Sequence, residues 1–242
     1  MISLHVSAVC HVRDGYTGKP LEASKLLCTL DGLPCRPVGK PGGCLVLVNL
    51  SGGAHRLSLR CPGFQEEWVE LVIGRETQEV DITMKPGENY PFQQTVTRLE
   101  LTVTRDGAPA SGEVLWLAVS GSNPLKLAQT KVEKGEQELR LYCKGPEAAV
   151  GMGAYLLSDG AKSEIVGLRS LEEEMGTLTA PLTQPHSRGK LLLPAQRYHT
   201  GEDGCVSAVF PSACTVEVYV EGAGLAASLT LEEGDNQETI QL

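Results

Sequence analysis

The sequence predicts an all-β protein made of two β-sandwich domains, the second enlarged by an insertion with one short helix. Short segments of alternating apolar and polar residues recur along the chain, and Gly, Pro, Asn and Asp separate them. The order of these segments in the first half returns in the second half. Alternation with a period of two is typical of strands with one buried face, and the separating residues favour turns.

In the first half, residues 2–12 alternate up to the turn residues Asp14 and Gly15 and predict the first strand. Strand-like runs follow at 26–30, 44–50, 55–60, 68–73 and 80–84, each bounded by turn-forming residues. Six short strands within about ninety residues are typical of a sandwich rather than of a helical or mixed fold.

Two stretches of the first half carry a family resemblance. Residues 12–21 read VRDGYTGKPL, and residues 49–59 read NLSGGAHRLSL and are followed by Pro62, Gly63 and Phe64. Over residues 5–86 this order resembles the carboxypeptidase regulatory-like, or transthyretin-like, sandwich modules, with His55 where that family usually has an aromatic residue. The resemblance implies a fold, because such modules serve mainly as folding, spacing or adhesion elements.

A domain boundary is predicted at residues 87–94. Two prolines and a glycine lie within 85–92, which excludes a central strand there. The predicted domains are a sandwich at 1–86 and a second sandwich at 95–242. In the second, the alternating run 97–107 ends at Asp106-Gly107, as the first strand ends at Asp14-Gly15, and later runs at 204–211, 215–220, 227–231 and 239–242 repeat the end of the first half.

We therefore interpret the second sandwich as a diverged copy of the first, opened by an insertion at about 120–200. Within the insertion, residues 139–143 and 153–157 are strand-like. The segment 170–176 predicts a short helix, with Ser170 as N-cap, Glu173 three residues later and Gly176 after the end.

Composition narrows the classes of partner. The chain has 242 residues, of which 41% are hydrophobic and 21% charged, so it can form real cores. The formal net charge is −9 and the basic residues are scattered, so nucleic acid is not an expected partner. The N-terminus has no basic leader, and no apolar run approaches eighteen residues. We expect no membrane insertion, and a protein that is cytoplasmic or part of a cytoplasmically assembled particle.

The eight cysteines show no CxxC pair and no zinc-finger spacing. Several lie in apolar strand patterns, so buried free thiols are expected rather than four disulfides. His5 and His11 share a strand face but lie about 20 Å apart at about 3.3 Å per residue, too far to share one metal ion. We expect no metal and no cofactor.

Four residues are candidate ligand contacts: Phe64, Trp68, His186 and His199. Trp68 lies beside two glutamates and near Phe64 and is the better candidate for exposure, whereas Trp116, in the apolar run 114–119, is expected to be buried. Tyr90 and Phe92 are expected to pack between the domains. His186 and His199 flank loop segments that we expect to be solvated.

An enzyme would require His186 and His199 to converge with Glu202 and Asp203. The chain has no GxSxG, HExxH or P-loop motif, and its one GxGxxA match, at residues 222–227, lies between two strand-like runs instead of opening a helix. The sequence thus predicts no enzyme. The leading prediction is a non-catalytic binding or structural module that mediates protein–protein interaction in a bacterial assembly.

The alternative is a carbohydrate- or peptide-binding sandwich. It would use Phe64, Trp68 and the loops around 120–135 and 183–204.

Overall fold

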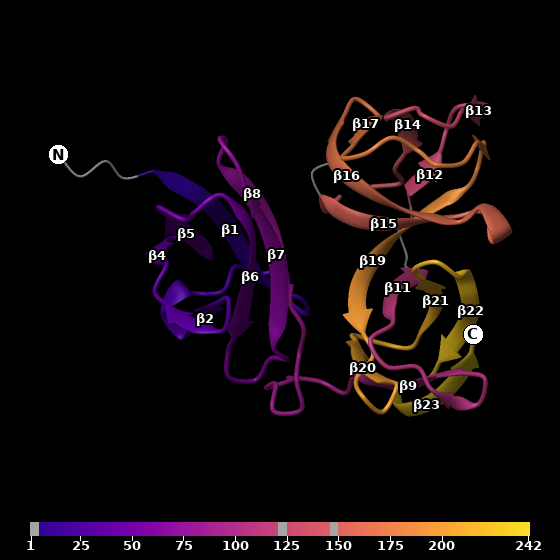
Figure 1. Cartoon of the computed structure of the whole chain (residues 1–242). Helices are drawn as coiled ribbons and strands as arrows, with labels where there is room; N and C mark the ends of the chain where they lie inside the picture. Colours follow the sequence, from indigo (N-terminus) through magenta and orange to yellow (C-terminus); the bar gives the residue numbers. More distant parts are fainter. Residues whose placement is uncertain (1–4, 121–124, 146–149) are drawn as a thin grey trace. The chain divides into compact units, whose positions relative to one another are not determined.

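The computed structural model describes residues 5–120, 125–145 and 150–242, and these are built almost entirely from strands (Figure 1). The all-β prediction is confirmed. Two three-residue 3-10 helices, η1 (Ala23–Lys25) and η3 (Gly160–Lys162), are the only helical elements in this described part. It contains no helix long and apolar enough to cross a membrane. The chain divides into two compact units, Met1–Gln94 and Thr95–Leu242.

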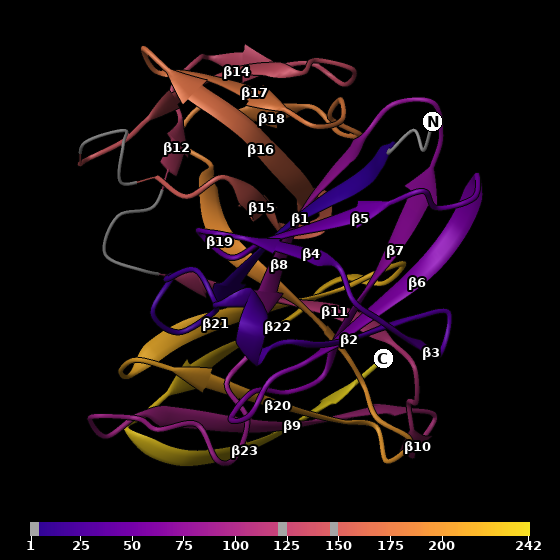
Figure 2. The same cartoon turned by 90° about the vertical axis from the view of Figure 1, so that its left-hand side faces the viewer.

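The first unit is a sandwich of two four-stranded sheets, which can be followed in Figure 2. One sheet has the order β4-β5-β1-β8, made of β4 (Val38–Lys40), β5 (Cys44–Val48), β1 (Val6–Asp14) and β8 (Gln78–Met84). The other has the order β3-β2-β6-β7, made of β3 (Leu33–Cys35), β2 (Leu27–Leu30), β6 (Gly53–Arg60) and β7 (Glu67–Ile73). Strand β1 is antiparallel to β5 and parallel to β8.

The period of two seen in the sequence sets which side chains form the core of the first unit. Alternate residues of β1, namely Ala8, Cys10 and Val12, point between the sheets, where they meet Leu57 and Leu59 of β6. Fully burying a leucine side chain stabilises a fold by about 1.5–3 kcal/mol, so this inner face holds the sandwich together. Ile2 and Leu4, predicted for the same face, lie outside the described residues.

The segment after β1 is fixed by the carboxylate of Asp14. Its Oδ1 accepts hydrogen bonds from the backbone N–H groups of Tyr16 (2.8 Å) and Thr17 (3.1 Å), and its Oδ2 accepts from Thr17 Oγ1 (2.8 Å) and Tyr90 Oη (2.6 Å). Burial raises the pKa of Asp14, but these hydrogen bonds outweigh burial and leave the pKa below its usual value. Asp14 is therefore a structural anchor of the 12–21 stretch.

The second unit contains a sandwich whose strands run in nearly the same relative directions as those of the first unit. In one sheet β9 (Thr97–Arg105) is antiparallel to β10 (Ala108–Pro109) and β20 (Cys205–Phe210) and parallel to β23 (Gly234–Gln241). The facing strands are β19 (Leu191–His199), β11 (Val114–Ser120), β21 (Cys214–Val220) and β22 (Gly224–Leu231), in that order. Residues 222–223 lie in the turn between β21 and β22, and residues 224–227 begin β22, so this segment does not open a helix.

The insertion between β11 and β19 forms a closed six-stranded antiparallel sheet together with the first residues of β19. Its strands, in order, are β12 (Leu125–Leu127), β14 (Glu138–Tyr142), β17 (Met175–Leu178), β16 (Glu164–Glu172), β15 (Gly153–Ser158) and β19, which pairs again with β12. Two short strands, β13 (Lys131–Val132) and β18 (His186–Ser187), pair beside it. Its interior is a leucine-rich core of its own.

Strand β19 belongs to both parts of the second unit. Its first residues, 191–194, pair with β12 and β15, and its last residues, 195–199, pair with β11 of the sandwich. Figure 1 shows the strand running from one part into the other.

The predicted helix at 170–176 is wrong. Residues Ser170 to Glu172 continue β16, and Met175 opens β17, so the segment is a hairpin in which Glu172 pairs with Met175. Glu173 and Glu174 form its turn with φ values of 49° and 65°. A helix of two turns forms few hydrogen bonds for the ordering that it requires, whereas the hairpin buries Leu171 in the core of the closed sheet.

Candidate functional site

The outer face of the sheet β3-β2-β6-β7 gathers the first unit's candidate binding residues. Because side chains alternate along each strand, Leu57 and Leu59 of β6 point inward, and Arg56, Ser58 and Arg60 point outward. The pairing register places Arg60 opposite Leu27, and Ser58 opposite both Thr29 and Trp68. Trp68 is thus partly exposed in the middle of this face.

Arginine and aromatic side chains are layered on the same face. The guanidinium carbon of Arg56 lies 4.2 Å from the centroid of the Trp68 ring, a cation–π contact worth about 0.5–1 kcal/mol at an exposed site. Arg60 donates to Glu66 Oε2 from Nε (2.8 Å), and a second guanidinium nitrogen lies 2.7 Å from the same oxygen. The cation–π contact with Trp68 holds the Arg56 guanidinium over the indole ring.

A cleft of about 1220 Å³ opens along the β2–β3 hairpin and continues onto this face. Apolar residues, among them Leu26, Leu27, Cys28 and Cys35, line it. Three arginines, Arg36, Arg56 and Arg60, line it as well, against one acidic residue, Glu66. Leu27 in the lining is 70% exposed and Leu33 in the hairpin is 71% exposed. The cleft therefore combines the exposed Leu27 with a positive charge, and the exposed Leu33 lies in the adjoining hairpin.

The hairpin beside the cleft has a defined turn. Asp31 and Gly32 both have positive φ, 51° and 79°, as the central residues of a two-residue type I′ turn require. Asp31 Oδ1 accepts from the backbone N–H of Arg56 (2.8 Å), and its Oδ2 lies 2.7 Å from His55 Nδ1. The turn is thereby tied to β6.

His55 takes a polar role at the position where the resembled family has an aromatic residue. Its Nε2 lies 2.9 Å from the carbonyl oxygen of Ser51, so both ring nitrogens face oxygen acceptors. The hydrogen bond with Asp31 is the main cause that raises the pKa of His55, and the hydrogen bond with Ser51 adds to it. The hydrogen bond with His55 in turn lowers the pKa of Asp31.

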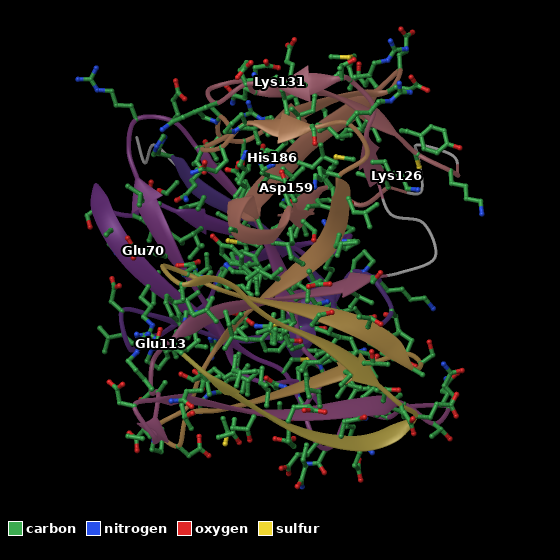
Figure 3. All side chains as sticks on the ribbon, turned by 90° about the vertical axis from the view of Figure 1, so that its right-hand side faces the viewer. Glu70, Glu113, Lys126, Lys131, Asp159 and His186 are labelled. Carbon is green, nitrogen blue, oxygen red and sulfur yellow. The ribbon has the colours of Figure 1, made fainter. Side chains whose placement is uncertain are left out.

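A second polar cluster surrounds His186 of β18, beside the closed sheet (Figure 3). His186 is only 2% exposed, and its Nδ1 lies 2.9 Å from Asp159 Oδ2 while its Nε2 lies 2.8 Å from Glu164 Oε1. Lys190 forms an ion pair with the other oxygen of Asp159. The expectation of a solvated loop is wrong for His186, because these paired charges allow the ring to be buried.

The carboxylates of this cluster are held in their ionised form. Burial raises the pKa of Glu164, but hydrogen bonds from His186, the backbone N–H and hydroxyl of Thr183, and the backbone N–H of Gln184 together lower it below its usual value. Burial likewise raises the pKa of Asp159, and its contacts with Lys190 and His186 lower it overall. Two carboxylates thus face an ammonium group and an imidazole ring, and both ring nitrogens lie within hydrogen-bonding distance of a carboxylate oxygen.

His199 lies away from this cluster. It is at the last position of the nine-residue strand β19, pairing with Val114, whereas Lys190 precedes the first position, so about 25–30 Å of strand separates the two ends. Glu202 and Asp203 are exposed in the loop before β20. The structure does not bring His186, His199, Glu202 and Asp203 together. Among the residues that the structure describes, no group of three or more His, Cys, Asp or Glu is placed to hold a metal ion.

Phe64 lies in an aromatic cluster, and Trp116 is more exposed than the sequence predicts. Phe64 packs edge-on against Tyr90 with ring centroids 5.2 Å apart, and Tyr16 and Phe92 complete this aromatic cluster within the first unit. The expected burial of Trp116 is wrong. Its ring points outward from β11, donates from Nε1 to Glu221 Oε1 (3.0 Å) and lies 5.9 Å from the guanidinium of Arg197. The run 114–119 is apolar on both faces because Ala118, on the same face as Trp116, packs against the closed sheet. This burial of Ala118 does not extend to Trp116.

Comparison with known proteins gives no match to a family model and none to a curated protein sequence. Among solved structures, the chain resembles the shaft pilin SpaA of Lactobacillus rhamnosus GG at 12% identity, covering 98% of this chain and 96% of that one, with a TM-score of 0.27. The major pilin subunit BcpA of Bacillus cereus matches at 9% identity, 99% and 99% coverage and a TM-score of 0.29. The minor pilin GBS52 of Streptococcus agalactiae matches at 10% identity, 98% and 94% coverage and a TM-score of 0.25.

These three solved structures are pilin subunits, and the sequence expectation of a cytoplasmic location is withdrawn.

Proposed function

We propose that the chain is a non-catalytic module of a bacterial assembly, and that its first unit binds an extended acidic segment of a partner protein in the arginine-lined cleft. The observation that carries the proposal is the lining of this cleft, where Arg36, Arg56 and Arg60 face a single acidic residue. Arginine is the side chain best suited to carboxylates, because its planar fork donates two parallel hydrogen bonds.

The cleft concentrates basic residues in an otherwise acidic chain. Residues 1–94 carry nine Lys and Arg against ten Asp and Glu, whereas residues 95–242 carry twelve against twenty. Three of the nine basic residues of the first unit thus line one cleft of a strongly acidic chain. Each exposed ion pair contributes only about 1 kcal/mol at 4 Å in water, so several pairs and apolar contact must act together.

The apolar contact in this proposal comes from exposed leucines of the hairpin. Leu27 and Leu33 are more exposed than any other large apolar residue of the described chain. The edge strand β3 has three residues and contains Pro34, which lacks an N–H group. A partner strand could add few backbone hydrogen bonds there, so side chains would make the contacts.

The carbohydrate alternative is less well supported. A sugar ring would stack on a free aromatic face, but the guanidinium of Arg56 already covers the Trp68 ring at 4.2 Å. A sugar would first have to displace Arg56.

As part of the proposal, both sandwiches are carboxypeptidase regulatory-like modules, at 1–86 and 95–242 with a linker at 87–94, and the second is a diverged copy of the first. A matching pair of glycines supports this. Gly43 has φ +72°, and its carbonyl accepts from Val12 N (2.8 Å); Gly204 has φ +72°, and its carbonyl accepts from Val103 N (2.9 Å). In both sandwiches a Cβ at this glycine would lie within 3 Å of the carbonyl oxygen of the residue that donates to it.

The binding proposal can be tested with labelled decapeptides that alternate Leu with Glu, Lys or Ser, measured by fluorescence anisotropy on the whole chain. We expect binding of the Leu–Glu peptide alone, weakening as salt rises. The double variant Arg36→Gln/Arg60→Gln should weaken it at least tenfold, whereas Arg188→Gln in the second unit serves as a matched control and should not. Equal binding of all three peptides, or none of the Leu–Glu peptide, would overturn the proposal.

A further inference from the structure

Two cysteines face each other in the β2–β3 hairpin. Cys28 of β2 and Cys35 of β3 are direct partners in the antiparallel register, with Thr29–Pro34 and Leu30–Leu33 between them and the turn. Cys28 is 8% exposed, Cys35 is half-buried, and both line the arginine-lined cleft.

The distance between direct partners suits a disulfide. Opposed residues of an antiparallel pair have Cα atoms about 4.5–5.5 Å apart, within the range of about 4.4–6.8 Å that a disulfide spans. The other nearby cysteines are placed less favourably. Cys10 lies in the opposite sheet, and facing sheets are about 10 Å apart. Cys44 pairs with His11, whereas its neighbours Leu45 and Leu47 point to the core, so its side chain faces outward.

We propose that Cys28 and Cys35 are a redox-sensitive pair, which a small-molecule disulfide such as oxidised glutathione converts to an intrachain disulfide. The more exposed Cys35 thiolate attacks one glutathione sulfur, the glutathione S–S bond breaks, and one glutathione thiolate leaves and takes up a proton. The Cys28 thiolate then attacks Cys35 Sγ of the mixed disulfide, and the second glutathione leaves. Two protein thiols are oxidised and one glutathione disulfide is reduced to two thiols.

The thiols set the pH dependence of the reaction. Burial raises the pKa of Cys35, and burial together with the proximity of Cys35 raises the pKa of Cys28 to about 11. Only the thiolate reacts, so the pair should react slowly near neutral pH, with a rate that rises about tenfold per pH unit below the thiol pKa.

The disulfide would close the hairpin next to its Asp31-Gly32 turn. It would fix β3, the edge strand that carries Leu33 and leads into Arg36, at the side of the cleft. The redox pair does not depend on the binding proposal, since it is detected by thiol chemistry and not by binding.

The test is a redox titration of the folded whole chain with oxidised glutathione at pH 8.5, followed by acid quenching, alkylation and peptide mapping. Cleavage before Asp31 separates Cys28 from Cys35, so a bridge between them joins two peptides. We expect this bridge in the wild type and in Cys44→Ser, a matched control with a half-buried thiol. Cys28→Ser should instead accumulate glutathione on Cys35, and Cys35→Ser should form no bridge.

Linkage of Cys28 to Cys10 in the folded wild type would overturn the assignment. So would loss of the bridge in Cys44→Ser, or a Cys35 that stays reduced while Cys44 reacts.

Discussion

At the scale of single residues, a largely enclosed cluster of charges surrounds His186. Asp159 and Glu164 face its two ring nitrogens at 2.9 Å and 2.8 Å, and both carboxylates are largely shielded from water. The sequence could point to His186 as a polar residue in a Pro- and Gly-containing segment. It could not indicate Asp159 or Glu164 as partners, because 27 and 22 residues separate them from the histidine.

Glu164→Gln should destabilise the second unit by about 3 kcal/mol at pH 7, because an amide NH2 group cannot accept the hydrogen bonds that each carboxylate oxygen accepts from Thr183 or Gln184. Urea unfolding followed by circular dichroism measures the change. Glu172→Gln is the matched control on the same strand, exposed, and should change the free energy of unfolding by less than about 0.5 kcal/mol. Equal effects of the two substitutions would contradict the buried network.

The effect of Glu164→Gln on the free energy of unfolding should depend on pH, because the pKa of Glu164 is lowered in the folded protein. A carboxyl whose pKa is lower in the folded than in the unfolded state stabilises the fold above its unfolded pKa of about 4.3, and the contribution is lost as pH falls through the folded value. The free-energy gap between wild type and Glu164→Gln should therefore be full at pH 7 and shrink below about pH 4.

At the scale of elements, strands were predictable where one face is buried and turns separate them. The alternation in β1 and β9 reports burial directly, and Asp14-Gly15 and Asp106-Gly107 mark where these strands end. The hairpin of β16 and β17 was mistaken for a helix because Ser170 and Glu173 match a capping pattern that depends on local sequence alone. Burial of Leu171, a long-range effect, decided the structure instead.

Glu173→Gly distinguishes a hairpin from a helix at this segment, because the substitution should stabilise a hairpin and destabilise a helix. Glu173 is exposed and has φ 49°, so glycine relieves left-handed strain and should stabilise the chain by about 0.5–1 kcal/mol. In a helix the same change would cost about 1 kcal/mol. Thermal or urea unfolding gives the sign. Glu172→Gly, one residue earlier in the strand, is the control and should destabilise by about 0.5–1 kcal/mol.

Gly204→Ala should destabilise far more than Gly222→Ala, although both glycines have positive φ. A Cβ at Gly204 would lie 2.6 Å from the carbonyl oxygen of Val103, whereas a Cβ at Gly222 would meet nothing within 4 Å. Left-handed strain alone costs about 1–2 kcal/mol, and the clash adds about 1–3 kcal/mol. Equal losses in urea unfolding would show that the backbone of β9 yields to the added methyl group.

At the scale of the whole molecule, the sequence indicated two similar sandwiches but not the closed sheet between β11 and β19. The proposed repeat rests on corresponding strands that keep their alternation and their turn residues. Closure of the inserted sheet depends on Leu125 pairing with Leu192, a contact across 67 positions that no local pattern announces. The candidate cleft was equally hidden, since Arg36, Arg56 and Arg60 are scattered in sequence and meet only in the folded sheet.

The cores of the second unit explain how an insertion of this size can be accommodated. Every residue of the sandwich core lies outside positions 120–193, from Leu99 to Leu117 and from Tyr198 to Ile240. The core of the closed sheet lies wholly within those positions. In the first unit the corresponding strands β2 and β3 are joined by the two-residue turn Asp31-Gly32. The second sandwich should therefore keep its core if the insertion is replaced by such a turn.

A variant in which Asp-Gly replaces residues 120–193 should fold and unfold cooperatively in urea. The register Ala118–Ala195 places Val119 opposite Pro194, so these two residues would flank the new turn as Leu30 and Leu33 flank theirs. Leu225→Thr is included because excision uncovers the apolar side of Leu225. In the control variant, Asp-Gly joins Ala118 directly to Pro194. This deletion of Val119 shifts the register by one residue and turns every side chain of β19 to the wrong face, so the control should not fold. If both variants unfold without cooperativity, the sandwich depends on its insertion and is not an independent copy of the first.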